Sequence, residues 1–289
     1  MTHFPDYLKT YPNADGPFPF HIGVHALERG FRAHRHDFLE LSYVISGRGS
    51  EAVNDVRHDM VPGTFTFVQP YQVHELFTEP GSTLLLYNCM FSMDLLMDAG
   101  GHGDGLAELI EPSALPPYTT FTGAMAERTR FLIDDMMREY EGGEPWRLPM
   151  LQARLKELLI CFDRERRKHR PDAAIAAPPI KKGASVWPIL HHLHRHYQED
   201  VTLSRLSERF AMSASRISEV IKEQTGQTFV HFLQDLRLRH ATSLLVSTDY
   251  SVVEVALEVG FGSYKTFAKI FRERKGMAPL AYRKAKRPV

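Results

Sequence analysis

The stretch LSRLSERFAMSASRISEVIK, residues 203–222, contains two short amphipathic segments separated by a break. Apolar residues recur at helical spacing in 203–210 and again in 217–221, which places each set on one face of a helix. Ser213 directly precedes the second segment, where its hydroxyl can accept a hydrogen bond from a backbone amide of the first turn. The stretch therefore predicts a helix, a tight turn and a second helix.

The second of these helices has a polar, partly basic outer face. A helix that is apolar on one side and polar on the other suits the major groove of DNA, because base edges and phosphates present hydrogen-bonding groups there. We therefore expect contacts with double-stranded DNA from the outward residues of this helix, which are Ser215, Arg216, Ser218, Glu219 and Lys222.

The same pattern returns nearer the carboxyl end. A long helix predicted over 229–246 leads to an apolar helical face in 252–259, a break at 260–263 and a second apolar face in 267–271. Two units spaced by one helix could enter successive openings of the major groove, about 34 Å apart. The outward residues of the second recognition helix are Tyr264, Lys265, Thr266, Lys269 and Arg272.

The charge of the chain is unevenly distributed, although the formal net charge is zero. Residues 1–180 hold 17 Lys and Arg against 25 Asp and Glu, a formal charge of −8, whereas residues 181–289 hold 18 against 10, a formal charge of +8. An acidic front and a basic back indicate that only the back meets a polyanion such as nucleic acid. An imbalance that merely faces solvent is the alternative.

Two further sets of residues stand at characteristic spacings, Gly260-Phe261, Phe267, Phe271, Gly276, Pro279 and Tyr282-Arg283, and Thr225-Gly226, Phe229, Arg237 and Ala241. By the type and spacing of these residues the chain resembles the AraC/XylS family of transcription regulators. The similarity covers residues 187–284. It implies that the protein activates transcription by contacting RNA polymerase, with repression as the alternative. It also implies that eight of the outward residues touch bases and backbone, namely Ser215, Arg216, Ser218, Glu219, Tyr264, Lys265, Thr266 and Lys269. Lys265 and Ala278 depart from the family pattern, so no base preference is implied.

The amino-terminal half has a strand-like pattern. From residue 34 to 91 apolar residues alternate in short runs broken by turn residues, which predicts a barrel or sandwich. Helical spacing in 124–140 and 148–167 predicts two helices behind it. The expected fold class is α+β, with an amino-terminal β-barrel, two trailing helices and an all-α tandem helix-turn-helix domain. The expected boundaries are 1–122 for the sensor, 123–169 for a helical dimerisation and relay segment, 170–183 for a Pro- and Ala-rich linker, and 184–289 for the DNA-binding domain.

Three histidines and a glutamate form the candidate site of this half. His34 and His36 are two apart on one predicted strand, so their side chains point the same way, and with Glu40 and His74 they could form a metal site. The set resembles the cupin pattern, and residues 31–47 are similar to the sensor domain of the rhamnose-type branch of the AraC family. The cupin resemblance implies a divalent metal ion, whereas the regulator resemblance implies a small ligand, frequently a sugar, in a metal-free pocket. Purely structural histidines are a third reading.

A polyhydroxyl ligand suits side chains with several donors and acceptors. The expected ligand-binding residues are Arg32, His34, His36, Glu40, Tyr43 and His74. The sequence thus favours a ligand-gated regulator, expected to be a homodimer, in which the ligand shifts the populations of domain arrangements. The alternative is a metal-dependent cupin enzyme fused to a DNA-binding domain.

The sequence shows no apolar run long enough to cross a bilayer and no secretory signal at its start, so no membrane association is expected. Cys89 and Cys161 lie far apart in apolar surroundings, which favours buried thiols over a disulfide framework. The expected compartment is the cytoplasm.

Overall fold

The computed structural model describes residues 5–8, 10–14, 18–54, 56–96, 106, 109, 115–168 and 186–286. The chain divides into two compact units, of which one holds Phe20–Ala177 and the other Pro178–Val289. The linker expected over residues 170–183 lies outside the described residues. In the part of the chain that the structure describes, no helix has the length and apolar character needed to cross a membrane.

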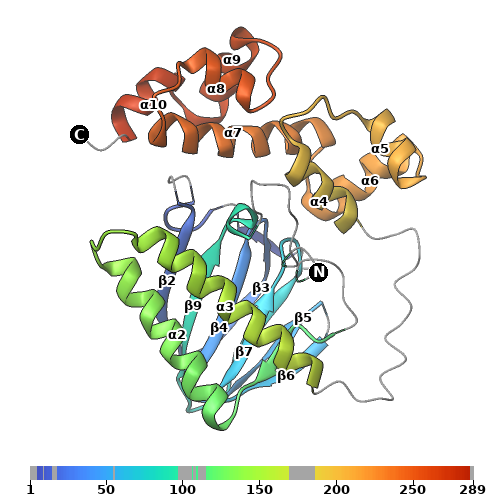
Figure 1. Ribbon diagram of the computed structural model, residues 1–289. Coiled ribbons are helices and arrows are strands. Elements are labelled where there is room, and N and C mark those ends of the chain that lie inside the picture. Colours follow the sequence, from blue (N-terminus) through green and yellow to red (C-terminus); the bar gives the residue numbers. More distant parts are fainter. Residues whose placement is uncertain are drawn as a thin grey trace. The chain divides into compact units, whose positions relative to one another are not determined.

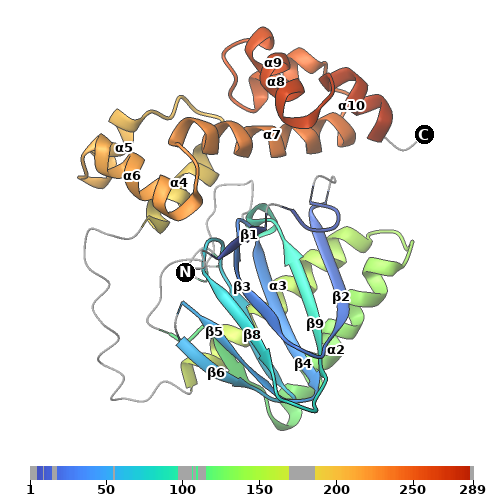
Figure 2. The same cartoon turned by 180° about the vertical axis from the view of Figure 1, so that it is seen from behind.

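The first unit contains two five-stranded sheets (Figures 1 and 2). One sheet has the order β1-β3-β8-β5-β6 and the other the order β10-β7-β4-β9-β2. The strands are β1 (Asp6–Leu8), β2 (Phe20–Leu27), β3 (Phe31–His36), β4 (Leu39–Ser46), β5 (Gly49–Val53), β6 (Val56–Met60), β7 (Thr64–Val68), β8 (His74–Thr78), β9 (Leu84–Phe91) and β10 (Tyr118–Thr120), and a 3-10 turn, η1 (Met93–Leu95), follows β9.

Two antiparallel helices, α2 (Gly123–Glu141) and α3 (Arg147–Lys168), cover the outer face of the second sheet (Figure 1). Because side chains alternate along a strand, Phe65 and Phe67 of β7 both point outward, and both rings pack on Phe162 of α3, with centroids 4.9 and 6.1 Å away. The bounds of both helices lie within one residue of those expected from periodicity, so this prediction is confirmed.

The inner faces of the two sheets have two different linings. One part is apolar and is built from Val44, Met60, Leu76, Leu84 and Leu86, all buried. The rest is polar, as described below. The first unit is thus a pair of facing β-sheets whose interior has one apolar part and one part able to bind a polar group.

The second unit is helical. Its elements are α4 (Trp187–His196), α5 (Leu203–Phe210), α6 (Ala214–Thr225), α7 (Phe229–Ser247), α8 (Val252–Glu258), α9 (Tyr264–Lys275) and α10 (Pro279–Lys286). Five of these helices begin with a Ser or Thr whose hydroxyl accepts a backbone N–H of the first turn, namely Thr202, Ser213, Thr228, Ser251 and Ser263. The cap expected at Ser213 is confirmed, as is the fold class: a β-rich domain followed by a helical helix-turn-helix domain.

The two helix-turn-helix pairs of this unit, α5–α6 and α8–α9, are held together around α7. From α7, Arg237 donates to the backbone carbonyl oxygens of Tyr197 and Glu199 at 2.7 and 2.8 Å, and its guanidinium lies over the ring of Phe261, 5.8 Å from the centroid. Gly260, at φ +88°, approaches the same loop so closely that a Cβ atom there would lie 2.6 Å from the carbonyl oxygen of Gln198. Only glycine fits at this position.

Candidate functional site

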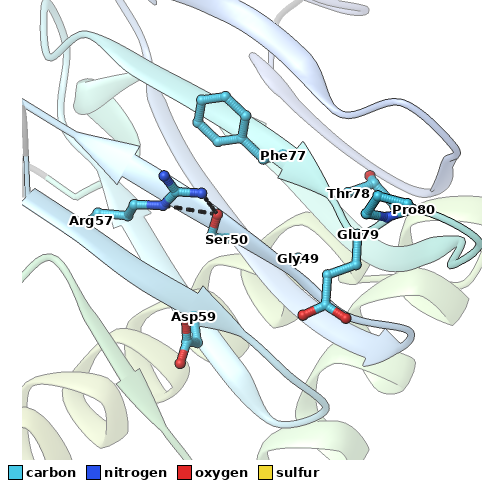
Figure 3. Close-up of a pocket in the computed structure, with 8 residues that line it drawn as sticks. All are labelled: Gly49, Ser50, Arg57, Asp59, Phe77, Thr78, Glu79 and Pro80. Atoms are coloured by element: carbon cyan, nitrogen blue, oxygen red, sulfur yellow. Dashed lines mark hydrogen bonds between the residues drawn. The ribbon is translucent and has the colours of Figure 1, made fainter.

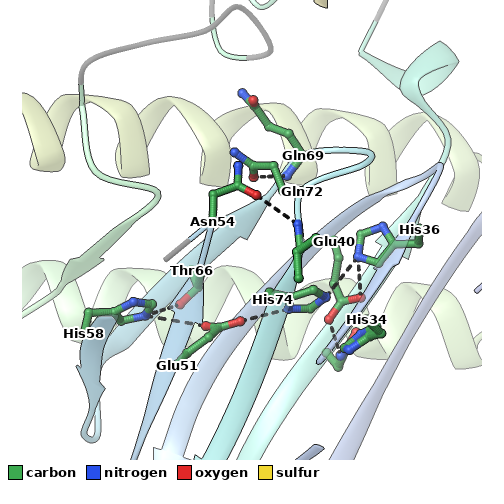
Figure 4. A network of polar contacts seen from close by, with 12 residues as sticks. His34, His36, Glu40, Glu51, Asn54, His58, Thr66, Gln69, Gln72 and His74 are labelled. Carbon is green, nitrogen blue, oxygen red and sulfur yellow. Dashed lines mark hydrogen bonds and ion pairs between the residues drawn. The ribbon is translucent and has the colours of Figure 1, made fainter. Parts of the chain in front are cut away.

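The four residues expected to form a metal site converge between the sheets of the first unit (Figure 4). His34 and His36 come from β3, His74 from β8 and Glu40 from β4 of the facing sheet. His34 and His74 are direct partners in the β3–β8 register. All four side chains are buried, and each offers a ligand atom within 4.8 Å of the others.

The three histidine rings are fixed through their Nδ1 atoms. Those of His34 and His36 lie 2.9 and 2.8 Å from backbone carbonyl oxygens, and that of His74 lies 3.0 Å from a carboxylate oxygen of Glu51. Carbonyl and carboxylate oxygens accept here, so each Nδ1 carries a proton and Nε2 of each ring is left to face the cluster. The Nε2 atoms of His36 and His74 lie 3.2 Å apart. A proton on one of these nitrogens, or a metal ion between them, suits this separation.

The donor set fits a divalent metal ion. Imidazole and carboxylate ligands suit zinc and other first-row transition metals. Ligand atoms bound about 2.1 Å from one ion lie about 3 to 3.5 Å from each other, and the separations from His36 Nε2 to His74 Nε2 and to Glu40 Oε2 are 3.2 and 3.3 Å. The fourth ligand, His34, lies beside His74, with ring centroids 4.0 Å apart.

A second layer of polar residues, which the sequence analysis did not identify, surrounds the cluster. Glu51 of β5 contacts His74, and its other carboxylate oxygen lies 3.5 Å from Nε2 of His58 on β6. On the opposite side, Asn88 of β9 donates to Oε1 of Glu40 at 2.9 Å. The signal that could have identified Glu51 and His58 is the alternation of side chains along a strand. Each of them stands two residues before an apolar residue that points inward, Val53 or Met60.

The electrostatics of the cluster favour charged carboxylates. Burial alone would raise the pKa of Glu40, but hydrogen bonding from His36 and the nearby charge of His74 lower this pKa to about 2. Glu51 behaves alike: burial opposes ionisation, and hydrogen bonds with His58 and His74 bring its pKa to about 2. Burial and the neighbouring His74 lower the pKa of His34 to about 4. The site thus combines two buried carboxylates with imidazole groups.

Two residues expected in the ligand pocket lie elsewhere. The side chain of Arg32 is 78% exposed and pairs with Asp6 at 2.6 Å, because the register of β3 against β8 shifts between Phe31 and His34. Tyr43 points to the opposite face of β4 from Glu40, since the two are an odd number of residues apart. Its hydroxyl donates to the carbonyl oxygen of Ala126 in α2, 3.5 Å away. The expectation that they line the pocket was wrong.

A separate hollow of about 430 Å³ lies on the outer face of the other sheet (Figure 3). Its lining residues are Gly49, Ser50, Arg57, Asp59, Phe77, Thr78, Glu79 and Pro80. Arg57 donates to the hydroxyl of Ser50 at 2.8 Å and stacks over the ring of Phe77 at 4.9 Å. Ser50 precedes the inward Glu51 by one residue, so this hollow and the His34 cluster lie on opposite faces of β5.

In the second unit, all ten residues expected to touch DNA are at least partly accessible. Arg216 and Ser218 are half-buried, and the others are exposed: Ser215, Glu219 and Lys222 on α6, and Tyr264, Lys265, Thr266, Lys269 and Arg272 on α9. The opposite faces of these helices are buried, through Ile217 and Ile221 on α6 and Phe267 and Phe271 on α9.

The two helices differ in charge. On α6 the guanidinium of Arg216 contacts the carboxylates of Glu219 and Glu223, at 2.6 and 3.6 Å. On α9, Lys265, Lys269 and Arg272 form no ion pair with any of the residues that the structure describes. The positive charge of α6 is therefore largely matched within the helix, whereas that of α9 is available to an external anion.

Comparisons with known proteins agree with the division of the chain into a β-rich unit and a helical unit. The AraC-like ligand binding domain family matches residues 20–159, and the helix-turn-helix domain family matches residues 206–285. The chain is similar to the HTH-type transcriptional activator RhaS of Salmonella typhimurium, with 25% identity over 274 residues that cover 94% of each protein.

Among solved structures, the C-terminal domain of AraT, a response regulator from Geobacillus stearothermophilus, is 28% identical; the match covers 37% of this chain and 91% of that one, with a TM-score of 0.36. Unsaturated fatty acid bound ToxT from Vibrio cholerae is 12% identical; the match covers 91% of this chain and 94% of that one, with a TM-score of 0.42.

The family resemblance expected from the sequence is thus confirmed over both domains. Because a ligand-binding domain precedes a helix-turn-helix domain, and because a transcription activator aligns along nearly the whole chain, the protein belongs to the AraC family of DNA-binding transcription regulators with a small-molecule binding domain.

Proposed function

We propose that this regulator senses a small polyhydroxyl effector, a sugar, inside its β-domain, where the effector binds beside a divalent metal ion. One observation carries the proposal: four buried side chains, His34, His36, Glu40 and His74, converge on one point in the domain that the AraC family uses for ligands. Imidazole nitrogens and a carboxylate that converge on one point attract a metal cation. Neighbouring hydroxyl groups of a sugar can then complete the ligand shell of that ion.

Occupancy of the site would act on DNA binding through a shift between arrangements of the protein. An effector shifts such an equilibrium only by its differential affinity for the two states. The helices α2 and α3 pack on the sheet that supplies Glu40, and ion pairs of 2.8 and 2.7 Å, Arg154 to Asp135 and Arg128 to Glu157, join them to each other. They are the candidates for relay and for the contact between the subunits of a homodimer.

The proposed DNA contacts are the ten outward residues of α6 and α9. Their helices begin at capped serines, and free amides at a helix start favour phosphate as well. The protein activates transcription by contact with RNA polymerase in this proposal, and activation is supported by the similar Salmonella typhimurium protein RhaS, a transcriptional activator. The cytoplasm is the compartment in which such a regulator meets its promoters.

A second candidate function is that of a metal-dependent cupin enzyme joined to a DNA-binding domain. The observation that favours it is the three-histidine, one-glutamate donor set, which can activate a bound oxygen ligand as well as hold an effector. The relative RhaS is a transcriptional activator, which favours the sensor.

The decisive experiment begins with genome-wide mapping of the bound sites, because neighbouring genes indicate the pathway and its sugar. Affinity for the mapped operator is then measured by fluorescence anisotropy with a panel of sugars, with and without added Zn²⁺ or Mn²⁺. We expect one sugar to change the affinity at least fivefold, and only in the presence of metal. If no sugar changes it under either condition while metal-loaded protein converts a sugar or diol, the enzyme is favoured.

A further inference from the structure

We propose that Glu51 is a positioning residue of the metal centre: its carboxylate holds the ring of His74 so that Nε2 faces the ion. The inference rests on the proposed metal centre but concerns a residue outside the ligand set. Glu51 lies on β5, next to β8, and its Oε1 accepts the Nδ1 proton of His74 at 3.0 Å. Both side chains are almost fully buried, at 2% and 0% exposure.

The histidine ligands are not held equally. His34 and His36 donate to carbonyl oxygens that belong to their own chain segment, two residues away. His74 instead depends on a side chain from a neighbouring strand. A carboxylate that accepts from a ligating imidazole fixes the ring orientation and increases the electron density on the coordinating nitrogen. Losing Glu51 would therefore free one ligand and leave the other two in place.

Glu51 is itself held from the far side. Its Oε2 lies 3.5 Å from Nε2 of His58, and that nitrogen is also 3.0 Å from the hydroxyl of Thr66 on the facing sheet. The ring of His58 stacks on Tyr118 of β10, with centroids 4.0 Å apart and planes 5° apart. The carboxylate is thus set between two histidines and has little freedom to turn (Figure 4).

The test measures metal binding by the full-length protein. Metal-stripped samples of wild type, Glu51→Leu, Glu51→Gln and the control Glu79→Gln, an exposed carboxylate just after β8, are titrated with Zn²⁺ against a chromophoric chelator, and the Co²⁺ absorption spectrum is recorded. Removing the second partner of a ligating histidine costs about 10- to 100-fold in metal affinity. We expect this loss in Glu51→Leu, with an altered Co²⁺ spectrum, and no change in Glu79→Gln.

The Gln variant keeps an acceptor for His74, so we expect it to retain more affinity than the Leu variant; a purely structural role would not predict this order. Operator binding checks that the variants fold. If Glu51→Leu does not fold, Glu51→Asp replaces it. The shorter carboxylate of Asp cannot reach His74, so the metal affinity of this variant should fall about tenfold. Wild-type affinity in the variants that fold overturns the inference. A wild-type protein that takes up neither metal overturns the metal centre itself.

Discussion

Nε2 of His36 and Nε2 of His74 face each other at 3.2 Å, while the Nδ1–H of each ring donates a hydrogen bond to an oxygen. A proton or a metal ion between these nitrogens satisfies both of them. The metal-bound reading of the site is favoured over an uncharged polar pocket because the ligand atoms of Glu40 and His34 converge on the same point. The two readings differ in what they predict for the purified protein.

Removing the metal should lower the stability of the β-domain. An ion present at 100 times its dissociation constant stabilises the folded state by about 2.7 kcal/mol, and for a domain of this size that corresponds to a fall of about 5 to 10 °C in Tm after chelation. Differential scanning fluorimetry before and after treatment with EDTA measures the change. The variant His36→Ala is the control, and an EDTA effect of the same size in that variant would argue against binding at this site.

Variants of the cluster should lose the response to effector and keep DNA binding. We expect His34→Ala and Glu40→Ala to bind the operator within about twofold of wild type, with an affinity that no longer changes with sugar, because the second unit folds around its own core. A reporter fused to the target promoter provides the readout. Arg57→Ala, in the outer hollow, should respond normally. The reverse result, with response lost only in Arg57→Ala, would move the effector site to that hollow.

The two recognition helices should contribute differently to DNA binding. Lys269 of α9 has no ion-pair partner in the described part of the chain, so Lys269→Ala should reduce the slope of log K against log salt by about 1 and weaken binding to all sequences. Arg216 is already paired with Glu219. Arg216→Ala should therefore change the slope less and the preference among operator variants more.

Salt titrations by fluorescence anisotropy, on the operator and on a scrambled duplex, test this contrast. Arg48→Ala is the control, because Arg48 is an exposed cation of the β-domain. Equal changes of slope in Lys269→Ala and Arg216→Ala would contradict the expected difference.

The stability of the helical unit should depend on pH through His192. Burial, His196 and Arg209 lower the pKa of His192 to about 4, against 6.5 for the unfolded chain. Between these values the unfolded chain binds more protons, so the contribution is complete above pH 6.5 and is lost as pH falls towards 4. His192 is partly accessible, and solvent screening limits the effect to below about 1 kcal/mol.

Urea unfolding between pH 4 and 7 measures this dependence. His192→Gln should flatten it, whereas His231→Gln, at an exposed position on α7, should leave it unchanged. Identical pH profiles for wild type and His192→Gln would show that the prediction is wrong.

The elements with strong periodicity could be predicted from the sequence. The helices α5 and α6 with their cap at Ser213, and the convergence of His34, His36, Glu40 and His74, follow from spacing and from a family resemblance. Spacing along the chain fixes the helices and the shared direction of His34 and His36. Glu40 and His74 stand on other strands, β4 and β8, and their place in the cluster follows from the resemblance.

What escaped prediction depends on contacts between distant segments. Glu51 and His74 meet because β5 pairs with β8, and a single sequence does not reveal strand pairing. Tyr43 is different, because its outward placement does follow from the sequence: it stands an odd number of residues from Glu40, and its hydroxyl accordingly meets α2. Arg32 was expected in the pocket but is exposed, because the register between β3 and β8 shifts beside it, and such a shift has no signal in the sequence.

The close approach of Gly260 to the carbonyl oxygen of Gln198, with Arg237 bonded across the same loop, has a consequence for the operator. The two helix-turn-helix pairs are joined by these contacts, so they cannot move apart to match a longer DNA segment between their binding sites. The two half-elements in the promoter must therefore keep a constant phase along the duplex. Inserting about five base pairs between them would turn one half-element to the far side of the helix, where the protein could reach only one at a time.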